Sequence, residues 1–230
     1  ERIAAFEQAA ANSPYANTPD TPQFLMLHQR MVAKLYGFVA PDVALQRYVE
    51  GDRSLPARYA RAIALYRKGT LGSALLTIDG LLKEYPNDPY FHEVRAQMLY
   101  ENGRAAESIP SNRRAVQLAP AAAILKIDLE RALLDVNNPD NDREAMRNLD
   151  LAMQQESENF ELWRLMASGY SKLGNQGMTS LARAEMATLR GQRAEAQSHA
   201  ETASRQLTAG TPAWQRAQDL KAYINSRPRK

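Results

Sequence analysis

The sequence predicts an all-α protein built from helix hairpins. Apolar and alanine residues recur at spacings of three and four, as in Tyr59, Ala62, Ile63 and Tyr66, which is the period of a helix. No segment shows the alternation of a strand. Several glycines and prolines separate the periodic segments, at Gly69, Gly103, Gly174, Gly191, Pro86, Pro120 and Pro212.

The composition is that of a folded globular domain. Hydrophobic residues make up 44% of the 230 residues and charged residues 24%, which is too apolar for a disordered chain. The longest uncharged stretch is Gln8–Pro19, which is far short of the about 20 apolar residues that a membrane-spanning helix needs, so we expect no membrane span. The absence of cysteine excludes disulfides, thiolate catalysis and cysteine-ligated metals.

The charge is uneven but does not indicate a nucleic-acid partner. The formal net charge is +3, and the segment 190–230 carries eight Lys/Arg against three Asp/Glu. Nucleic-acid binders usually concentrate basic residues on a folded face with aromatic residues for stacking. Here much of the excess lies at the end of the sequence, in Arg227–Lys230. We therefore interpret it as a solvated terminus.

An internal repeat is visible in the sequence. Pro86 and Pro120 are 34 positions apart. With these prolines at repeat position 32, Ala62 and Ala96 occupy position 8, and position 20 holds Ala74 in one repeat and Ser108 in the next. Small side chains at these positions let two helices approach closely. This period and pattern resemble the tetratricopeptide repeat (TPR), which implies an α-solenoid.

Further units follow the first two repeats. Residues Trp163–Gly174 fit the first helix of a TPR, and a degenerate repeat precedes them, with helices expected at 121–136 and 142–155. The connection Asn137–Asp142 is longer than the pattern allows, and Glu130 falls where a small residue is expected. The register of this repeat therefore stays open. Alanine-rich helices at 178–190 and 192–208 continue the pairing, and a helix from about Pro212, carrying Trp214, is expected to cap the solenoid.

The segment 1–56 differs from the rest. It holds five of the twelve prolines and predicts helices at 2–11, 22–38 and 41–49 without the repeat pattern. We therefore expect two domains, a helical lead-in at 1–56 and a TPR-like repeat domain at 57–230.

No pattern of residues supports catalysis. The three histidines, His28, His92 and His199, are far apart in the sequence, and no His-Glu-x-x-His or Gly-x-Ser-x-Gly is present. The turn Gly69–Gly72 lacks the Gly-Lys-Ser/Thr of a phosphate-binding loop. We expect no enzyme activity, no metal site and no cofactor in this chain.

The TPR resemblance implies a binding surface instead. In TPR arrays, positions 2, 5, 9, 12 and 13 of each first helix face a concave groove, and tyrosine and arginine dominate interaction hot spots. Tyrosines that pack between repeats are the alternative. The predicted partner-binding groove consists of Tyr59, Tyr66, Arg67, Tyr90, Gln97, Tyr100, Arg164 and Lys172.

The lead-in adds a second resemblance. Residues 13–15, 20–22, 28–38, 56–60, 87–91 and 214–219 resemble the region after the protease domain in BepA-like (YfgC-like) periplasmic zinc metalloproteases. These are HtpX-related gluzincins with a C-terminal TPR domain. Leu27 stands where that family usually has arginine.

This resemblance implies a larger parent protein. The sequence starts at Glu1 without a signal peptide, so we expect a piece of a periplasmic protease, with zinc only in the protease domain outside it. The repeats would contact substrates or envelope-assembly proteins and pack against the protease domain. A stand-alone TPR scaffold or co-chaperone is the alternative, and an enzyme in its own right is disfavoured.

Overall fold

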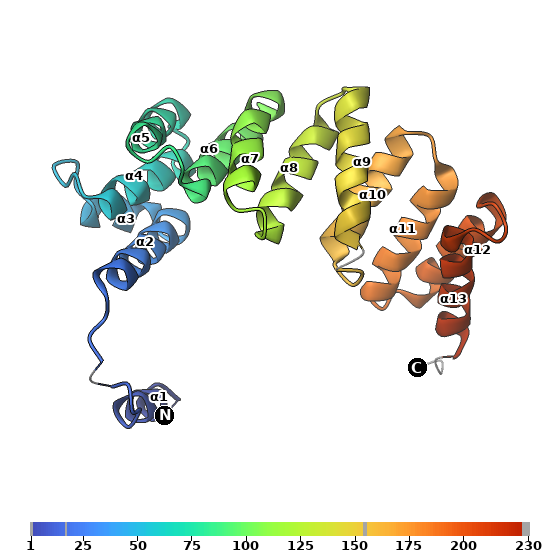
Figure 1. The fold of residues 1–230 in the computed structure, drawn as a ribbon, viewed down its shortest axis with the longest axis horizontal. Helices are drawn as coiled ribbons and strands as arrows, with labels where there is room; N and C mark the ends of the chain where they lie inside the picture. The colour runs from blue at the N-terminus through green and yellow to red at the C-terminus, as the bar shows by residue number, and fades with distance from the viewer. Residues whose placement is uncertain (1, 17, 154–155, 227–230) are drawn as a thin grey trace. The chain divides into compact units, whose positions relative to one another are not determined.

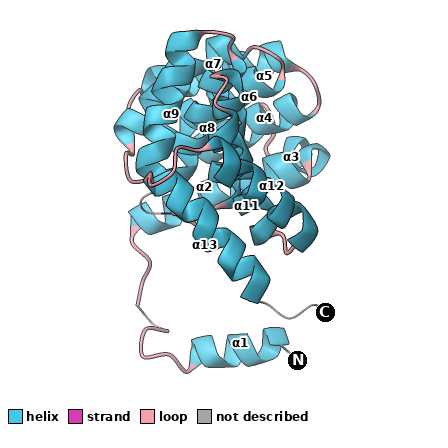
Figure 2. Cartoon of the chain, turned by 90° about the vertical axis from the view of Figure 1, so that its right-hand side faces the viewer, coloured by secondary structure: helices cyan, strands magenta, loops and turns pink. Residues whose placement is uncertain are grey.

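The computed structural model describes residues 2–16, 18–153 and 156–226, and over these residues it contains helices and no strand (Figure 2). The predicted all-α class is confirmed. The helices are α1 (Arg2–Ala11), α2 (Pro22–Val39), α3 (Pro41–Arg47), α4 (Leu55–Arg67), α5 (Leu71–Glu84), α6 (Pro89–Glu101), α7 (Ala105–Leu118), α8 (Ala123–Asp135), α9 (Pro139–Met153), α10 (Phe160–Lys172), α11 (Gln176–Leu189), α12 (Arg193–Gln206) and α13 (Pro212–Ser226).

Polar caps determine where several of these helices begin. Thr21 precedes α2, and its side chain accepts a hydrogen bond from the backbone N–H of Phe24. The side chain of Asp88 accepts hydrogen bonds from two backbone N–H groups at the start of α6. The side chain of Asn159 accepts from two at the start of α10. α2 and α6 also begin with proline, which has no N–H to leave unpaired at the first helical position.

The chain divides into two compact units, Glu1–Pro86 and Asn87–Lys230. This division follows internal contacts, whereas the domain boundary expected after residue 56 follows the repeat pattern and stays a prediction. In the first unit, α2 packs along α4, while α3 and α5 also pack on α4 (Figure 1). α4 is thus the central helix of that unit.

The α2–α4 contact depends on a glycine. A Cβ atom added to Gly37 on α2 would lie 2.8 Å from Cβ of Ile63 on α4 and 3.1 Å from the carbonyl oxygen of Ala60. Neither of these atoms can move without moving the backbone of α4. The two helices therefore approach as closely as they do because residue 37 has no side chain.

The second unit is a succession of helix hairpins. Each helix from α6 to α13 packs against the next one in sequence, and the first helices of consecutive hairpins, α6, α8 and α10, also touch one another (Figure 1). The predicted final helix is α13, which packs on α11 and α12 and buries Leu220 and Ile224 against their alanines. This pattern of neighbours is that of a TPR-like α-solenoid with a capping helix.

The degenerate repeat has a different geometry from the one predicted. The segment Asn137–Asp142 is not an extended connection, because α9 already begins at Pro139, with Asn138 accepting hydrogen bonds from two backbone N–H groups of its first turn. The extra residues of this repeat lie after the start of α9. The starts of α9 and α10, at positions 139 and 160, are farther apart than those of α5 and α6 (71 and 89) or of α7 and α8 (105 and 123). The predicted helix 142–155 ends in residues 154 and 155, which lie outside the described residues.

This geometry fixes the register that the sequence left open. Glu130 is the eighth residue of α8, as Ala62, Ala96 and Ala167 are the eighth residues of α4, α6 and α10. Likewise Asp142 is the fourth residue of its helix, as Ala74 is of α5 and Ser108 of α7. All of these residues are buried. The α8–α9 hairpin therefore carries a carboxyl group at both positions where the hairpins α4–α5 and α6–α7 carry small side chains.

We expect Gly37→Ala to lower the free energy of unfolding by about 1–3 kcal/mol, the usual cost of forcing extra volume into a packed contact. Gly72→Ala is the matched control, because a Cβ atom there meets nothing within 4 Å and alanine favours a helix over glycine. Urea denaturation of both variants measures the effect. Equal stabilities would contradict the assigned role of the α2–α4 contact.

Candidate functional site

Two of the predicted groove residues in the first unit are buried. Tyr59 is 1% exposed and Tyr66 8% exposed, so neither offers a surface to a partner, whereas Arg67 is exposed. For Tyr59 the reason is α2, because the guanidinium carbon of Arg30 lies 5.3 Å from the centre of the Tyr59 ring. The lead-in helix covers the face of α4 that the TPR pattern assigns to a groove.

The predicted residues of α6 are more accessible. Tyr90 is 45% exposed, and Gln97 is half-buried, with its amide donating to Glu101 at 2.7 Å. Tyr100 is also half-buried, and its hydroxyl donates to a carboxylate oxygen of Asp135 on α8. α6 therefore contributes side chains that reach the neighbouring first helix.

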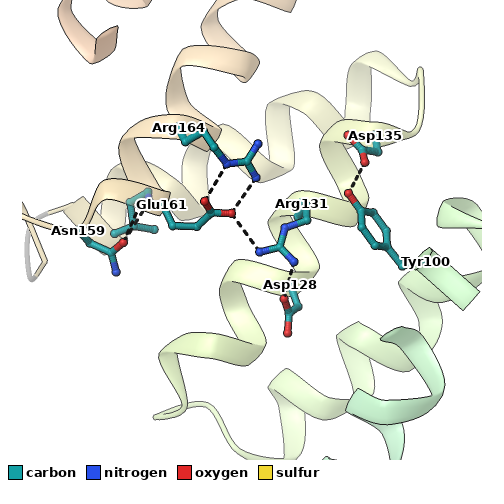
Figure 3. A network of polar contacts seen from close by, with 8 residues as sticks. Tyr100, Asp128, Arg131, Asp135, Asn159, Glu161 and Arg164 are labelled. Atoms are coloured by element: carbon teal, nitrogen blue, oxygen red, sulfur yellow. Dashed lines mark hydrogen bonds and ion pairs between the residues drawn. The ribbon is translucent and has the colours of Figure 1, made fainter. Parts of the chain in front are cut away.

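A chain of ion pairs continues from α8 to α10 (Figure 3). Arg131 on α8 donates to Asp128 at 3.1 Å and to Glu161 on α10 at 3.0 Å. Arg164 holds Glu161 from the other side with two hydrogen bonds of 2.7 Å. We call Tyr100, Asp128, Arg131, Asp135, Glu161 and Arg164 the first-helix face. It joins the first helices of three consecutive hairpins.

The electrostatics of this face follow from these contacts. The hydrogen bonds from Arg164 lower the pKa of Glu161, and the hydrogen bond from Arg131 lowers it further. Glu161 is also the second residue of α10, where a negative charge interacts well with the helix dipole. Burial raises the pKa of Tyr100 to about 12, and its hydrogen bond to Asp135 acts in the same direction. At neutral pH the face therefore presents two arginines, three carboxylates and a neutral phenol.

Lys172 takes a structural position instead. Its ammonium group donates to the backbone oxygen of Leu134 on α8 and lies 3.6 Å from the buried carboxylate of Asp142. It thus supplies a counter-charge to one of the two buried carboxyl groups of the degenerate hairpin. Lys172 was predicted to lie in the groove, but its contacts connect α10 to the α8–α9 hairpin.

The side chains that α8 contributes to this face were not among the predicted groove residues. Carrying the repeat period forward from Gln97 and Glu101 gives Arg131 and Asp135, which are the residues that join α6 to α10. The signal was therefore in the sequence. It was overlooked because the register of the degenerate repeat was left open.

The second buried carboxyl group of that hairpin is Glu130, which is 3% exposed. Burial raises its pKa to about 8, and the neighbouring Glu144 also raises it, while a hydrogen bond from Asn148 and the charge of Arg113 lower it. Glu130 is therefore mostly protonated at neutral pH.

The described residues hold no group of three or more His, Asp or Glu side chains arranged to bind a metal ion. None of the helices that the structure describes combines the length and the apolar character needed to cross a bilayer.

Comparison with known proteins agrees with this geometry. Residues 59–123 match the family model of the tetratricopeptide repeat. This segment of the chain is therefore similar to tetratricopeptide repeats. The matched segment runs from α4 to the start of α8 and includes the hairpin α6–α7, whose first helix carries Tyr90, Gln97 and Tyr100.

Solved structures extend the likeness over more of the chain. A crystal structure of MamA has a TM-score of 0.53 at 14% sequence identity, and the alignment covers 71% of this chain and 92% of MamA. The structure of MamA MSR-1 C2 has a TM-score of 0.53 at 13% identity, with 86% of this chain and 97% of the other covered. At such identities the likeness concerns the TPR fold alone. The comparison with curated proteins gives no match.

The raised pKa of Glu130 predicts a pH-dependent stability of the TPR fold. The folded state keeps the Glu130 proton up to about pH 8, whereas the unfolded chain releases it near the ordinary value of about 4.3. Stability contributed by this group therefore falls as the pH rises from about 5 to about 8 and then levels off.

Glu130→Gln should remove this dependence, since glutamine does not titrate. We expect the melting midpoint of the wild type, relative to that of Glu130→Gln, to fall by at least about 3 °C between pH 5 and pH 8.5. Thermal melts followed by circular dichroism measure the difference. Parallel pH profiles for the two proteins would contradict the burial of an unmatched carboxyl group.

Proposed function

We propose that this chain is a non-catalytic protein–protein interaction domain of the TPR type, whose first-helix face binds a segment of a partner protein. The observation that carries this proposal is the row of arginine, tyrosine and carboxylate side chains on α6, α8 and α10. Arginine and tyrosine are the residues that most often dominate interface energies. The charges of this face are paired with one another, and a partner segment with complementary charges can replace these pairs with its own.

We further propose that the parent protein is a BepA-like periplasmic zinc metalloprotease. The support is the sequence resemblance of the lead-in, together with a row of exposed apolar residues along α2. Their spacing of three or four places them on one face of the helix, whereas Ala33 and Gly37 are buried. Leu27 departs from the arginine that is usual in that family, and it lies within this row, between Phe24 and Met31. The row consists of Phe24, Leu27, Met31, Leu35 and Val39, each more than half exposed.

An apolar row of this kind is suited to packing against another domain, which in a BepA-like parent would be the protease domain. The zinc would belong to that domain and not to this chain. The second candidate is a stand-alone TPR scaffold or co-chaperone, favoured by the repeats alone. The gene sequence upstream of Glu1 separates the two, since a signal peptide and a His-Glu-x-x-His motif there would support the protease and their absence would support the scaffold.

The proposed binding face can be tested by site-specific photo-crosslinking. A benzophenone amino acid replaces Tyr90, which is exposed on the first helix α6, and the control position is Gln117, which is exposed on the second helix α7. After irradiation in cells, cross-linked proteins are identified by mass spectrometry. We expect adducts from position 90 and few from position 117.

A second variant links the adducts to the first-helix face. Arg164→Ala removes a side chain of the hot-spot type, which typically costs at least about 1–2 kcal/mol of binding energy, so the yield at position 90 should fall about tenfold. Circular dichroism confirms that the variant is folded. Equal yields from positions 90 and 117, or adducts that ignore Arg164→Ala, would place partner binding on another surface.

A further inference from the structure

The α8–α9 hairpin borders a cavity, partly open to solvent, that the proposed function does not use. It has a volume of about 280 Å³ and lies between α8 and α9, with Val116 of α7 and Leu162 of α10 completing its wall. Most of the lining is apolar, as at Ile127 and Leu149, and the polar lining comes from Lys126, Glu130, Asn148 and Glu156. Its volume is roughly that of nine water molecules in the liquid, which is enough for a short alkyl chain.

One carboxylate oxygen of Glu130, a residue that lines this cavity, has no hydrogen-bond partner among the described residues. Oε1 of Glu130 accepts a hydrogen bond of 2.8 Å from the side-chain amide of Asn148. Oε2 is fully buried and has no hydrogen-bond partner among the residues described. Leaving a buried polar atom unpaired is costly, and such atoms are uncommon in folded proteins. A ligand that donates a hydrogen bond at this point would remove the cost.

The register of the repeat shows that this carboxyl group is not required by the fold. The equivalent residues of the other first helices are Ala62, Ala96 and Ala167. Asp142 occupies the other small-residue position of the same hairpin, but there the structure supplies Lys172 as a counter-charge. Glu130 has no such match. A buried carboxyl group without a counter-charge is thus specific to this one position of the repeat.

The charged groups around the cavity favour a cation when Glu130 is ionised. Glu156 at the lining adds a second carboxylate, and Lys126 adds one positive charge. Glu144 on α9 and Arg113 on α7 act on Glu130 with opposite signs, and they neutralise each other in an ion pair of 2.7 Å. Lys126 precedes Glu130 by four positions on α8 and makes no hydrogen bond with it within the described structure. With Glu130 ionised, the cavity therefore carries a net negative charge.

We propose that this cavity binds an alkylammonium group, with the alkyl chain among Ile127, Leu149 and Leu162 and the ammonium donating a hydrogen bond to Oε2 of Glu130. An ammonium group offers three donors and a full positive charge, which suits a buried carboxylate better than a neutral donor does. The group can come from a free alkylamine or from a lysine side chain of a protein. This inference does not depend on the proposed function.

The proposal has a pH signature. Because burial raises the pKa of Glu130 to about 8, a bound ammonium must displace a proton at neutral pH. Affinity should therefore increase about tenfold per pH unit below pH 8 and level off above it, since alkylammonium groups stay charged until about pH 10. A ligand that accepts a hydrogen bond from the protonated carboxyl group would show the opposite trend.

The test uses n-hexylamine and its neutral isostere 1-hexanol, titrated into the protein and followed by the side-chain amide NMR signal of Asn148. We expect saturable binding of the amine at pH 8, at least tenfold weaker binding at pH 6.5, and at least tenfold weaker binding of the alcohol. Nα-acetyl-lysine N-methylamide, which keeps the side-chain ammonium group, distinguishes a lysine side chain from a free alkylamine. Its binding supports a protein lysine, whereas binding of hexylamine alone supports a free amine.

Variants connect the binding to the carboxylate. Glu130→Gln keeps the shape of the side chain, and Glu130→Ala restores the residue found in the other hairpins, so at least one of them should fold. Both should weaken hexylamine binding at least tenfold, whereas Glu158→Gln, outside the cavity lining, should leave it unchanged. No saturable binding, equal affinities for amine and alcohol, or binding that survives in a folded Glu130 variant would overturn the proposal.

Discussion

The fold depends on close approach of paired helices at two small-residue positions. The eighth residue of the first helix and the fourth residue of the second are alanine or serine in the hairpins α4–α5 and α6–α7, and all of these residues are buried. A larger side chain there must find space by moving a helix or a neighbour, as the 2.8 Å approach of a Gly37 Cβ atom to Ile63 illustrates at another contact. The repeat period follows from this constraint, because each repeat must place a small side chain at the same contact between its two helices.

The same constraint explains which surfaces remain for binding. In the first unit, α2 lies against α4 and covers Tyr59, so this first helix is already occupied by a segment of the same chain. In the second unit, α6, α8 and α10 carry their polar side chains on a face where they contact one another, from Tyr100 to Arg164. The proposed binding face therefore lies in the second unit. A partner must compete with ion pairs that are partly exposed to water, and such pairs are individually weak.

Periodicity and caps allowed most of the fold to be predicted. The helix at 2–11 has the expected bounds, and Pro22, Pro41 and Pro212 begin helices as expected, because each terminus depends on residues next to it in sequence. The burial of Tyr59 could not be predicted, since it depends on a lead-in helix that has no repeat pattern to place it. The second helix of the degenerate repeat begins at Pro139 and not near residue 142 as predicted. Asn138 and Pro139, which the prediction assigns to a loop, together form this helix start.

The two carboxyl groups of the α8–α9 hairpin have different physical consequences. Asp142 is compensated by Lys172 from α10, so its burial links two hairpins and stays consistent with a structural role. Oε1 of Glu130 accepts a hydrogen bond from Asn148, whereas Oε2 has no hydrogen-bond partner among the described residues, and Glu130 lines the cavity. Oδ1 of Asp142 also has no hydrogen bond, but the ammonium group of Lys172 lies 3.6 Å from it and supplies the opposite charge, which Glu130 lacks. A position that violates the packing rule without local compensation is where a function is to be sought. The contrast between Asp142 and Glu130, within one hairpin, is what directs attention to the cavity rather than to the repeat as a whole.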